Sequence, residues 1–358
     1  MEKKINFQLL SIFILASLLI VSTLAKNPLF IFGDSILDAG NNNYINTSTL
    51  VQANIRPYGI TFFHFPTGRF SDGRIISDFI AEHANLPFIP PFLQPGKHHF
   101  YNGVNFASAA AGALAETNQG LVIDFHMQLQ NYKKVEKLFR HKFGEVEAKK
   151  RLTSAVYLFS IGANDYLSLF LTNSSILTTY TKSEYVELVI GNITSVITEI
   201  YNTGGRKFAF LNVPKIGCVP VSRISNADGE CNTEPSEYAM LHNRALFHVL
   251  EELKMKLPGF KYSFYDFYTC AQQRIDYPSK YGFKEGKTAC CGTGKFRGIW
   301  SCGGTRLVKE FELCENVNDY VFWDSTHFTE KVYEQLADEM WNLHSYGSHS
   351  IKELFYLS

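Results

Sequence analysis

Five short runs of apolar residues recur along the chain, separated by longer segments of mixed polarity. The runs are continuous rather than alternating, and several of them stop at a glycine or a proline. Strands that are buried on both faces of a parallel sheet have this pattern. It predicts strands at residues 28–32, 104–107, 155–161, 207–213 and 262–267.

The intervening segments carry apolar residues at the three- and four-residue spacing of an amphipathic helix. Because strands alternate with helices, the pattern indicates an α/β fold with a parallel sheet and right-handed crossovers. The spacing predicts helices over residues 77–84, 127–139, 183–201, 238–253 and 329–343, the last of which closes the domain.

One stretch rich in glycine and cysteine, over residues 276–320, interrupts the alternation of strands and helices. We expect this stretch to leave the sheet as a long excursion and not to form a separate domain. The sequence contains no internal repeat, low-complexity tract or linker, so residues 26–358 are predicted to form a single domain.

The N-terminus has the features of a secretory signal peptide. Two lysines precede an apolar run over residues 7–21, and small residues lead to Ala25. An uncleaved membrane anchor is the alternative, but the run is short and is interrupted by Ser11 and Ser17. The sequence therefore predicts that residues 1–25 are removed and that the protein is secreted.

The composition favours a folded protein without a charged macromolecular partner. Hydrophobic residues make up 46% of the chain and charged residues 19%, enough apolar surface for a large core. Lysine plus arginine equals aspartate plus glutamate, with 34 residues each, so charge gives no reason to expect nucleic acid or an anionic membrane. No segment after the N-terminal run is apolar enough to span a bilayer, so stable membrane insertion is not expected.

Cysteines and glycosylation sequons agree with secretion. Asn46, Asn173 and Asn192 begin Asn-x-Ser/Thr sequons. All seven cysteines lie in the last two-fifths of the chain, which suggests a disulfide-bonded region, and at least one thiol must stay unpaired within the chain. A zinc site is the rival interpretation, but paired C-x-x-C units and suitably spaced histidines are missing, so we expect no metal. A short loop favours a disulfide between Cys218 and Cys231; Cys290, Cys291, Cys302 and Cys314 can then pair among themselves and leave Cys270 free.

Polar residues follow the predicted strands where ligands bind in open α/β sheets, beyond the carboxyl ends of the strands. Ser35 follows the first strand, Gly112 comes after the second and Asn164 follows the third. Asp324 and His327 lie three residues apart, just before the helix predicted over residues 329–343.

These five residues match the needs of acyl transfer. A serine hydroxyl becomes nucleophilic when a histidine takes its proton, and the histidine needs a carboxylate on its other nitrogen. The oxyanion needs fixed donors, which the N–H groups of Ser35 and Gly112 and the side-chain amide of Asn164 can supply. Taken singly, each segment has a structural alternative as a turn or a helix cap. Together they predict Ser35 as nucleophile, with Asp324 and His327 as its partners.

Four blocks of the sequence stand out at the ends of the predicted strands and before the last predicted helix. They are FIFGDSILDAGNN at residues 30–42, GVNFAS at 103–108 followed by Gly112, SIGANDY at 160–166 and DSTH at 324–327. Together they resemble the plant GDSL esterase/lipase family, within the SGNH hydrolase superfamily, and the resemblance covers nearly the whole mature chain. It implies a three-layer α/β/α, flavodoxin-like fold with a five-stranded parallel sheet, the same triad and oxyanion donors, and neither a metal nor an organic cofactor.

The chain departs from the family pattern at three places. Ile36 replaces the leucine of the family name, three alanines at residues 109–111 stand where many members have glycines, and Phe328 stands where proline is common. None of these changes removes a catalytic group. Residues 278–283 and 289–292 resemble those of secreted pathogen-response members, which implies a role in plant defence and a location in the cell wall or apoplast.

The sequence therefore predicts a carboxylic ester hydrolase that acts on a small-molecule or lipid ester through an acyl-enzyme on Ser35. An acyltransferase would use the same residues, with an alcohol in place of water. A non-catalytic, defence-associated binding protein on the same scaffold is the third possibility, but no catalytic residue has been lost. The sequence does not select an oligomeric state.

Overall fold

A computed structural model describes residues 26–96, 99–343 and 348–357 of the protein. The predicted signal peptide over residues 1–25 lies outside the described residues. Five parallel strands form the central sheet in the order β2-β1-β3-β4-β5, which is the flavodoxin-like order. This sheet confirms the predicted α/β fold class. Its strands are β1 (Leu29–Gly33), β2 (Gly103–Asn105), β3 (Val156–Ser160), β4 (Lys207–Leu211) and β5 (Lys261–Tyr265).

The two faces of the sheet bury different kinds of side chain, because successive residues of a strand point to opposite faces. One face is aromatic: Phe159 stacks between Phe32 and Phe210, with ring centroids 5.1 and 5.0 Å apart. The other face is aliphatic and includes Ile31 and Leu158, which pair in register. The continuous apolar runs of the sequence are therefore explained by burial on both faces.

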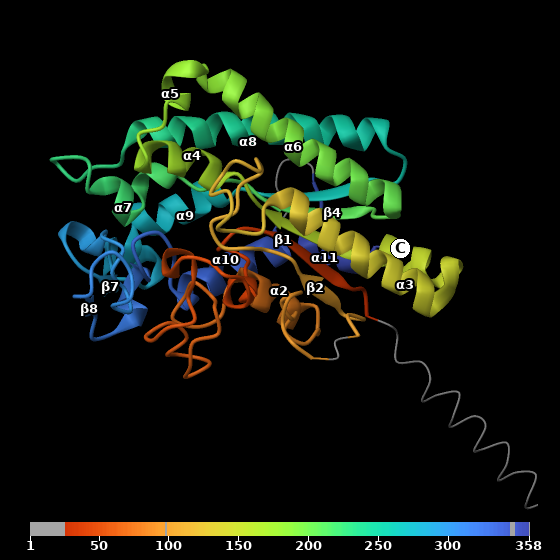
Figure 1. The fold of residues 1–358 in the computed structure, drawn as a ribbon, viewed down its shortest axis with the longest axis horizontal. Coiled ribbons are helices and arrows are strands. Elements are labelled where there is room, and N and C mark those ends of the chain that lie inside the picture. Colours follow the sequence, from red (N-terminus) through yellow and green to blue (C-terminus); the bar gives the residue numbers. More distant parts are fainter. Residues whose placement is uncertain (1–25, 97–98, 344–347, 358) are drawn as a thin grey trace, which may run out of the picture.

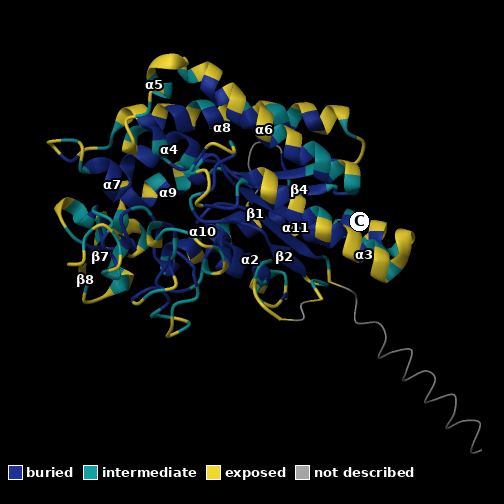
Figure 2. Cartoon of the chain, in the orientation of Figure 1, coloured by how far each residue is buried: buried dark blue, intermediate teal, exposed yellow. Residues whose placement is uncertain are grey.

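Helices cover both faces and make a three-layer structure (Figure 1). Residues of α3, α6 and α8 pack in the cluster on the aromatic face, and residues of α2, α9, α10 and α11 pack in the cluster on the aliphatic face. Figure 2 shows the strands buried and the outer sides of α3, α6 and α8 exposed. The α-helices are α2 (Ile76–His83), α3 (Phe125–Ser154), α4 (Ala163–Leu171), α5 (Ile176–Thr179), α6 (Lys182–Thr203), α7 (Pro220–Arg223), α8 (Thr233–Lys256), α9 (Phe267–Asp276), α10 (Glu330–Asn342) and α11 (Ile351–Tyr356).

Several predicted boundaries differ from the structure. The helix predicted over residues 127–139 continues to Ser154, across a non-helical break at Gly144. The strand predicted over residues 262–267 ends at Tyr265, because Asp266 caps α9 by accepting a hydrogen bond from the Thr269 N–H. Helices α4, α9 and α11 were not predicted, and α11 follows α10, so the helix over residues 329–343 is not the last one.

The predicted excursion is present as residues 277–319, which we call the disulfide segment. Its short strands are β6 (Glu285–Ala289), β7 (Cys291–Gly292) and β8 (Glu312–Leu313), and β6 pairs with β9 (Tyr320–Phe322), which follows the segment. Two disulfides, Cys290–Cys314 and Cys291–Cys302, cross-link it. The predicted Cys218–Cys231 disulfide is also present, and Cys270 is free.

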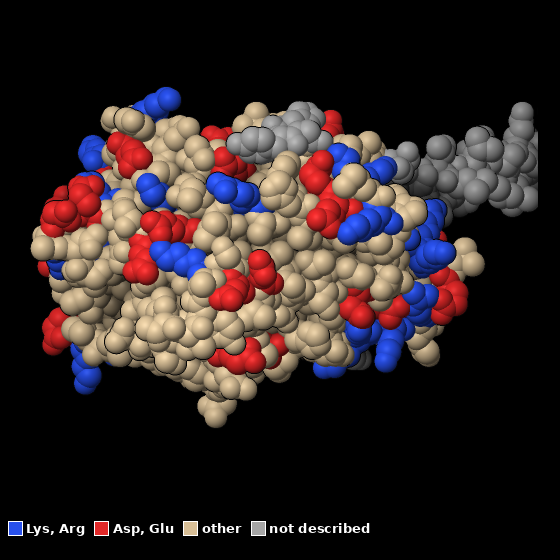
Figure 3. Space-filling model, turned by 90° about the horizontal axis from the view of Figure 1, so that it is seen from above, with Lys and Arg blue, Asp and Glu red and all other residues tan. Residues whose placement is uncertain are grey.

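The surface carries charges of both signs. On the face shown in Figure 3, lysine and arginine side chains are interspersed with aspartate and glutamate, with wide uncharged areas between them. Within the described residues, no helix is both long enough and apolar enough to cross a membrane.

Candidate active site

The turn after β1 presents Ser35 at the carboxyl edge of the sheet. Gly33 has a φ of 146°, and a Cβ at this position would lie 2.1 Å from the carbonyl oxygen of Ser160 on β3, so only glycine fits. The Asp34 N–H then donates to the same carbonyl at 3.1 Å, and the Asp34 carboxyl accepts from the Ile36 N–H at 3.0 Å. These contacts fix the turn that carries Ser35.

A continuous line of hydrogen bonds joins Ser35, His327 and Asp324, so the structure brings the three residues of the predicted triad together. The Nε2 atom of His327 lies 2.8 Å from the Ser35 Oγ, and its Nδ1 lies 2.8 Å from Asp324 Oδ1. Asp324 also folds its own loop, because Oδ1 accepts the N–H groups of Thr326 and His327 at 2.9 and 2.8 Å. One carboxylate therefore places the imidazole both through the backbone and through the ring.

The environment keeps Asp324 ionised. Burial opposes ionisation of this carboxyl, but the adjacent His327, the Arg306 charge and a hydrogen bond from Tyr58 together hold its pKa well below its usual range. The Phe70 ring packs against the imidazole, with ring centroids 4.5 Å apart. An ionised acceptor on Nδ1 leaves Nε2 available to take the serine proton.

Of the three predicted oxyanion donors, Ser35 and Asn164 line one cavity, and Gly112 is not part of its lining. The Gly112 Cα packs against Asp165 and Thr117, where a Cβ would lie 2.4 and 2.5 Å from side-chain atoms. Ala110 lines the cavity instead, with a φ of 64° that is unusual for a non-glycine residue.

Donors for an oxyanion are available at this place. Within the described part of the chain, the N–H groups of Ser35 and Ala110 donate no hydrogen bond. The Asn164 amide donates one hydrogen to the Ala111 carbonyl at 3.0 Å and, since an amide has two N–H bonds, keeps the other.

Three buried carboxyl groups brace the loops around Ser35. Asp165 accepts the N–H groups of Ala113 and Leu114, and Asp38 accepts the N–H of Ala109 at 3.0 Å. Burial raises the pKa of Asp34 to about 7 and those of Asp38 and Asp165 to about 6, although backbone donors lower them. Asp38 and Asp165 tie the loop after β2 to the segments that follow β1 and β3, and Asp34 holds the turn that carries Ser35.

A cavity of about 320 Å³ opens beside the triad. Its polar lining includes Ser35, His327, Asn164 and Arg306. Most of its other walls are apolar and come from widely separated segments: Leu50, Val51, Phe70, Leu121, Leu167, Leu171, Ile216, Val219, Trp300 and Phe328. Among the described residues, no group of three or more His, Cys, Asp or Glu side chains is placed to hold a metal ion.

The model of the GDSL-like lipase/acylhydrolase family matches residues 29–340. The chain belongs to this family. It is similar to GDSL esterase/lipase 5 of Arabidopsis thaliana, with 59% identity over 88% of this chain and 82% of that protein. GDSL esterase/lipase 2 of the same plant is 52% identical over 88% of this chain and 86% of its own length, and GDSL esterase/lipase 1 is 48% identical over 99% and 100%. Membership places the chain among the carboxylic ester hydrolases.

The departures from the GDSL pattern have structural consequences. Ile36 is buried and lines the cavity, so it fills the place of another apolar side chain. Phe328 stacks on Phe322, with ring centroids 5.1 Å apart, and belongs to the core in addition to the cavity wall.

Sequence reasoning missed three residues of this GDSL hydrolase site: Ala110, Tyr58 and Arg306. The alanines at residues 109–111, where glycines are common, were the available signal for Ala110, because a positive φ favours glycine. Tyr58 lies 266 residues from Asp324 in the sequence, and nothing in the local pattern links the two.

Proposed function

We propose that the protein hydrolyses carboxylic esters through an acyl-enzyme on Ser35. The Ser35 Oγ attacks the ester carbonyl carbon while His327 Nε2 takes the hydroxyl proton. The tetrahedral intermediate places its oxyanion among the N–H groups of Ser35 and Ala110 and the Asn164 amide. The intermediate collapses, and His327 gives the proton to the departing alkoxide, which leaves as the alcohol.

The second half of the reaction uses the same groups. His327 takes a proton from water as the water oxygen attacks the acyl carbon. The second tetrahedral intermediate expels Ser35, which regains its proton, and the carboxylic acid leaves. An acyltransferase would differ only in the attacking oxygen, so product analysis with added alcohols distinguishes the two activities.

The observation that carries this proposal is the pair of contacts at His327, 2.8 Å to Ser35 and 2.8 Å to Asp324. A nucleophile, a base and an orienting carboxylate within hydrogen-bond reach are the signature of an activated serine. The apolar walls of the adjacent cavity favour an ester with an apolar acyl or alcohol group. Because the triad is complete, a non-catalytic binding role is less well supported.

Ser35→Ala tests the mechanism. We expect the variant to fold normally and to lose p-nitrophenyl ester hydrolysis by about 10⁶-fold in kcat, since the nucleophile is removed. Ser168→Ala is a matched control, because Ser168 lines the same cavity from α4, and it should retain activity and fluorophosphonate labelling. Normal turnover by a folded Ser35→Ala protein would refute the proposal.

We also propose that the protein is a secreted glycoprotein. Asn46, Asn173 and Asn192 are all exposed, which leaves their side chains accessible to glycosylation. Protein purified from plant tissue should begin at Lys26 and should lose mass on treatment with a peptide N-glycosidase. A mature chain that begins at Met1 would contradict signal cleavage. The role in plant defence, implied by the resemblance, stays a prediction.

A further inference from the structure

A buried tyrosine outside the triad touches the triad carboxylate. The Tyr58 side chain is fully buried, and its hydroxyl donates to Asp324 Oδ2 at 2.6 Å. The other oxygen of Asp324 is held by the N–H groups of its own loop. Oδ2 also lies 3.0 Å from His327 Nδ1. Tyr58 therefore gives Oδ2 a second hydrogen bond, from outside the loop of Asp324 and His327, and restrains the rotation of the carboxylate about its Cβ–Cγ bond.

The Tyr58 hydroxyl keeps its proton near neutral pH and so remains a hydrogen-bond donor. Burial raises the pKa of its phenol well above the usual range, and although the Arg306 charge opposes this change, the neighbouring Asp324 carboxylate adds to it. Because hydrogen bonds to a charged group are stronger than those between neutral groups, this contact is able to hold Asp324 in one orientation.

Arg306 holds Tyr58 from the disulfide segment. The guanidinium carbon lies 5.0 Å from the centroid of the Tyr58 ring, within the range of a cation–π contact. Arg306 also donates to the Gln52 carbonyl at 2.8 Å, on the loop that carries Tyr58. Trp323, next to Asp324, packs edge-on against the tyrosine, with ring centroids 5.8 Å apart.

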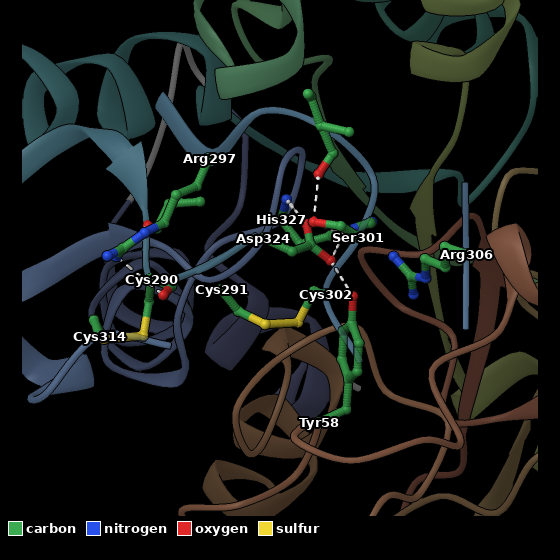
Figure 4. The surroundings of a disulfide bond; sticks show 12 residues. Tyr58, Cys290, Cys291, Arg297, Ser301, Cys302, Arg306, Cys314, Asp324 and His327 are labelled. Carbon is green, nitrogen blue, oxygen red and sulfur yellow. Dashed lines mark hydrogen bonds and ion pairs between the residues drawn. A yellow bond between two sulfur atoms is a disulfide. The ribbon is translucent and has the colours of Figure 1, made fainter. Parts of the chain in front are cut away.

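The disulfide segment is docked on this loop at further points. Thr49 donates to the Thr305 carbonyl at 2.7 Å, and a Cβ on Gly303 would lie 2.5 Å from an Ile55 side-chain atom. Figure 4 shows Tyr58 pointing to Asp324, with the Cys291–Cys302 disulfide on one side and Arg306 on the other. Arg306 follows Cys302 by four residues, so the disulfide limits how far the guanidinium can move.

We propose that Tyr58 is a positioning residue that orients Asp324 toward His327, and that Arg306, anchored through the disulfide segment, holds Tyr58 in place. This inference rests on the proposed esterase function. Without the Tyr58 hydroxyl, Oδ2 keeps its contact with His327 Nδ1 but loses the donor outside that pair. The carboxylate is then freer to rotate, and His327 spends less time aligned with Ser35. The cavity that binds the ester is unchanged, so the loss falls on kcat and not on KM.

Tyr58→Phe tests the inference, with Tyr132→Phe as the matched control. Tyr132 is equally buried and also loses hydroxyl hydrogen bonds, to Tyr157 and Thr203, but it lies away from the triad. We expect Tyr58→Phe to lower kcat for a p-nitrophenyl ester by about 10- to 100-fold, the effect of one hydrogen bond to a charged group, with KM changed less than about twofold. The control should keep its kcat.

A second variant keeps the inference testable if Tyr58→Phe folds poorly. Arg306→Met removes the charge while keeping a long side chain, and it should lower kcat by less than Tyr58→Phe. The double variant should be no slower than Tyr58→Phe alone, because both changes act through the same carboxylate. Fully additive effects, or an unchanged kcat in folded Tyr58→Phe, would overturn the inference. The proposed function is tested separately by comparing the parent protein with Ser35→Ala. If the parent protein hydrolyses the ester and Ser35→Ala does not, the proposed function holds even when the Tyr58→Phe result contradicts this inference.

Discussion

The central sheet and the disulfide segment (residues 277–319) each support one side of the candidate active site. The sheet supplies Ser35 from the turn after β1 and Asn164 from the start of α4, which follows β3, and these two strands pair along their whole length. The disulfide segment leads into β9 and the loop of Asp324 and His327, and it has only short strands held by two disulfides.

The difference lies in how many contacts fix each side. Every residue of β1 pairs with β3, and both faces of these strands are buried, so the Ser35 side is fixed by many small contributions. The His327 side depends on a few individual contacts, among them Cys291 N–H to the Trp323 carbonyl at 2.7 Å and Tyr58 to Asp324. A single substitution should therefore disturb the geometry of the His327 side more easily.

Asp324→Asn should give the largest effect on that side. An asparagine at this position cannot stabilise the imidazolium and favours the wrong imidazole tautomer, so we expect kcat to fall by about 10⁴-fold with the fold retained. Ester hydrolysis and thermal unfolding measure the two outcomes. Asp72→Asn is the control, since Asp72 is equally buried but lies outside the cavity lining. A similar loss in both variants would mean that burial of a carboxylate matters, and not its contact with His327.

The sequence predicted the sheet side better than the His327 side. All five strands of the sheet were predicted within a few residues, because their apolar runs are continuous and stop at turns. Ser35 and Asn164 follow such strands directly, so the rule for ligand sites in α/β sheets placed them. Asp324 and His327 follow no strand of this sheet, and their pairing with Ser35 was inferred from chemistry and family resemblance.

The parts that were missed depend on contacts between distant segments. Local pattern placed the oxyanion donor at Gly112, whereas the conformation of the loop after β2 brings Ala110 to the cavity. Tyr58 reaches Asp324 only because a long loop after β1 packs against the disulfide segment. Figure 1 shows this loop beside β7 and β8. Neither arrangement has a periodic signal, since periodicity reports burial along one element and not contact between two loops.

Asn164→Ala tests the sheet side at the oxyanion. The change removes one donor, and we expect kcat to fall by about 10²- to 10³-fold with little change in KM, because the donor acts mainly on the developing negative charge. Asn164→Asp should be at least as slow, since a carboxylate of nearly the same shape would repel the oxyanion. If Asn164→Asp retained activity, neither oxyanion donation nor the hydrogen bond to the Ala111 carbonyl would be needed, because a carboxylate can donate to neither.

Removal of one disulfide from each of two regions should separate stability from catalysis, with the smallest effect on rate. Cys291→Ser/Cys302→Ser and Cys218→Ser/Cys231→Ser open loops of similar length, with separations of 11 and 13 residues. Chain entropy alone predicts that each double variant loses about 3 kcal/mol of unfolding free energy, measured by denaturant titration.

Only the first pair lies in the disulfide segment, so only its removal should also lower kcat, measured at a temperature well below that of unfolding. The decrease in kcat should be smaller than the loss of about 10- to 100-fold expected for Tyr58→Phe, because Arg306 gains freedom while the Tyr58 hydroxyl remains. Equal kcat values in the two double variants would mean that the disulfide segment keeps its contacts with the active site without the Cys291–Cys302 disulfide. The His327 side would then differ from the Ser35 side only in the polar contacts that hold it.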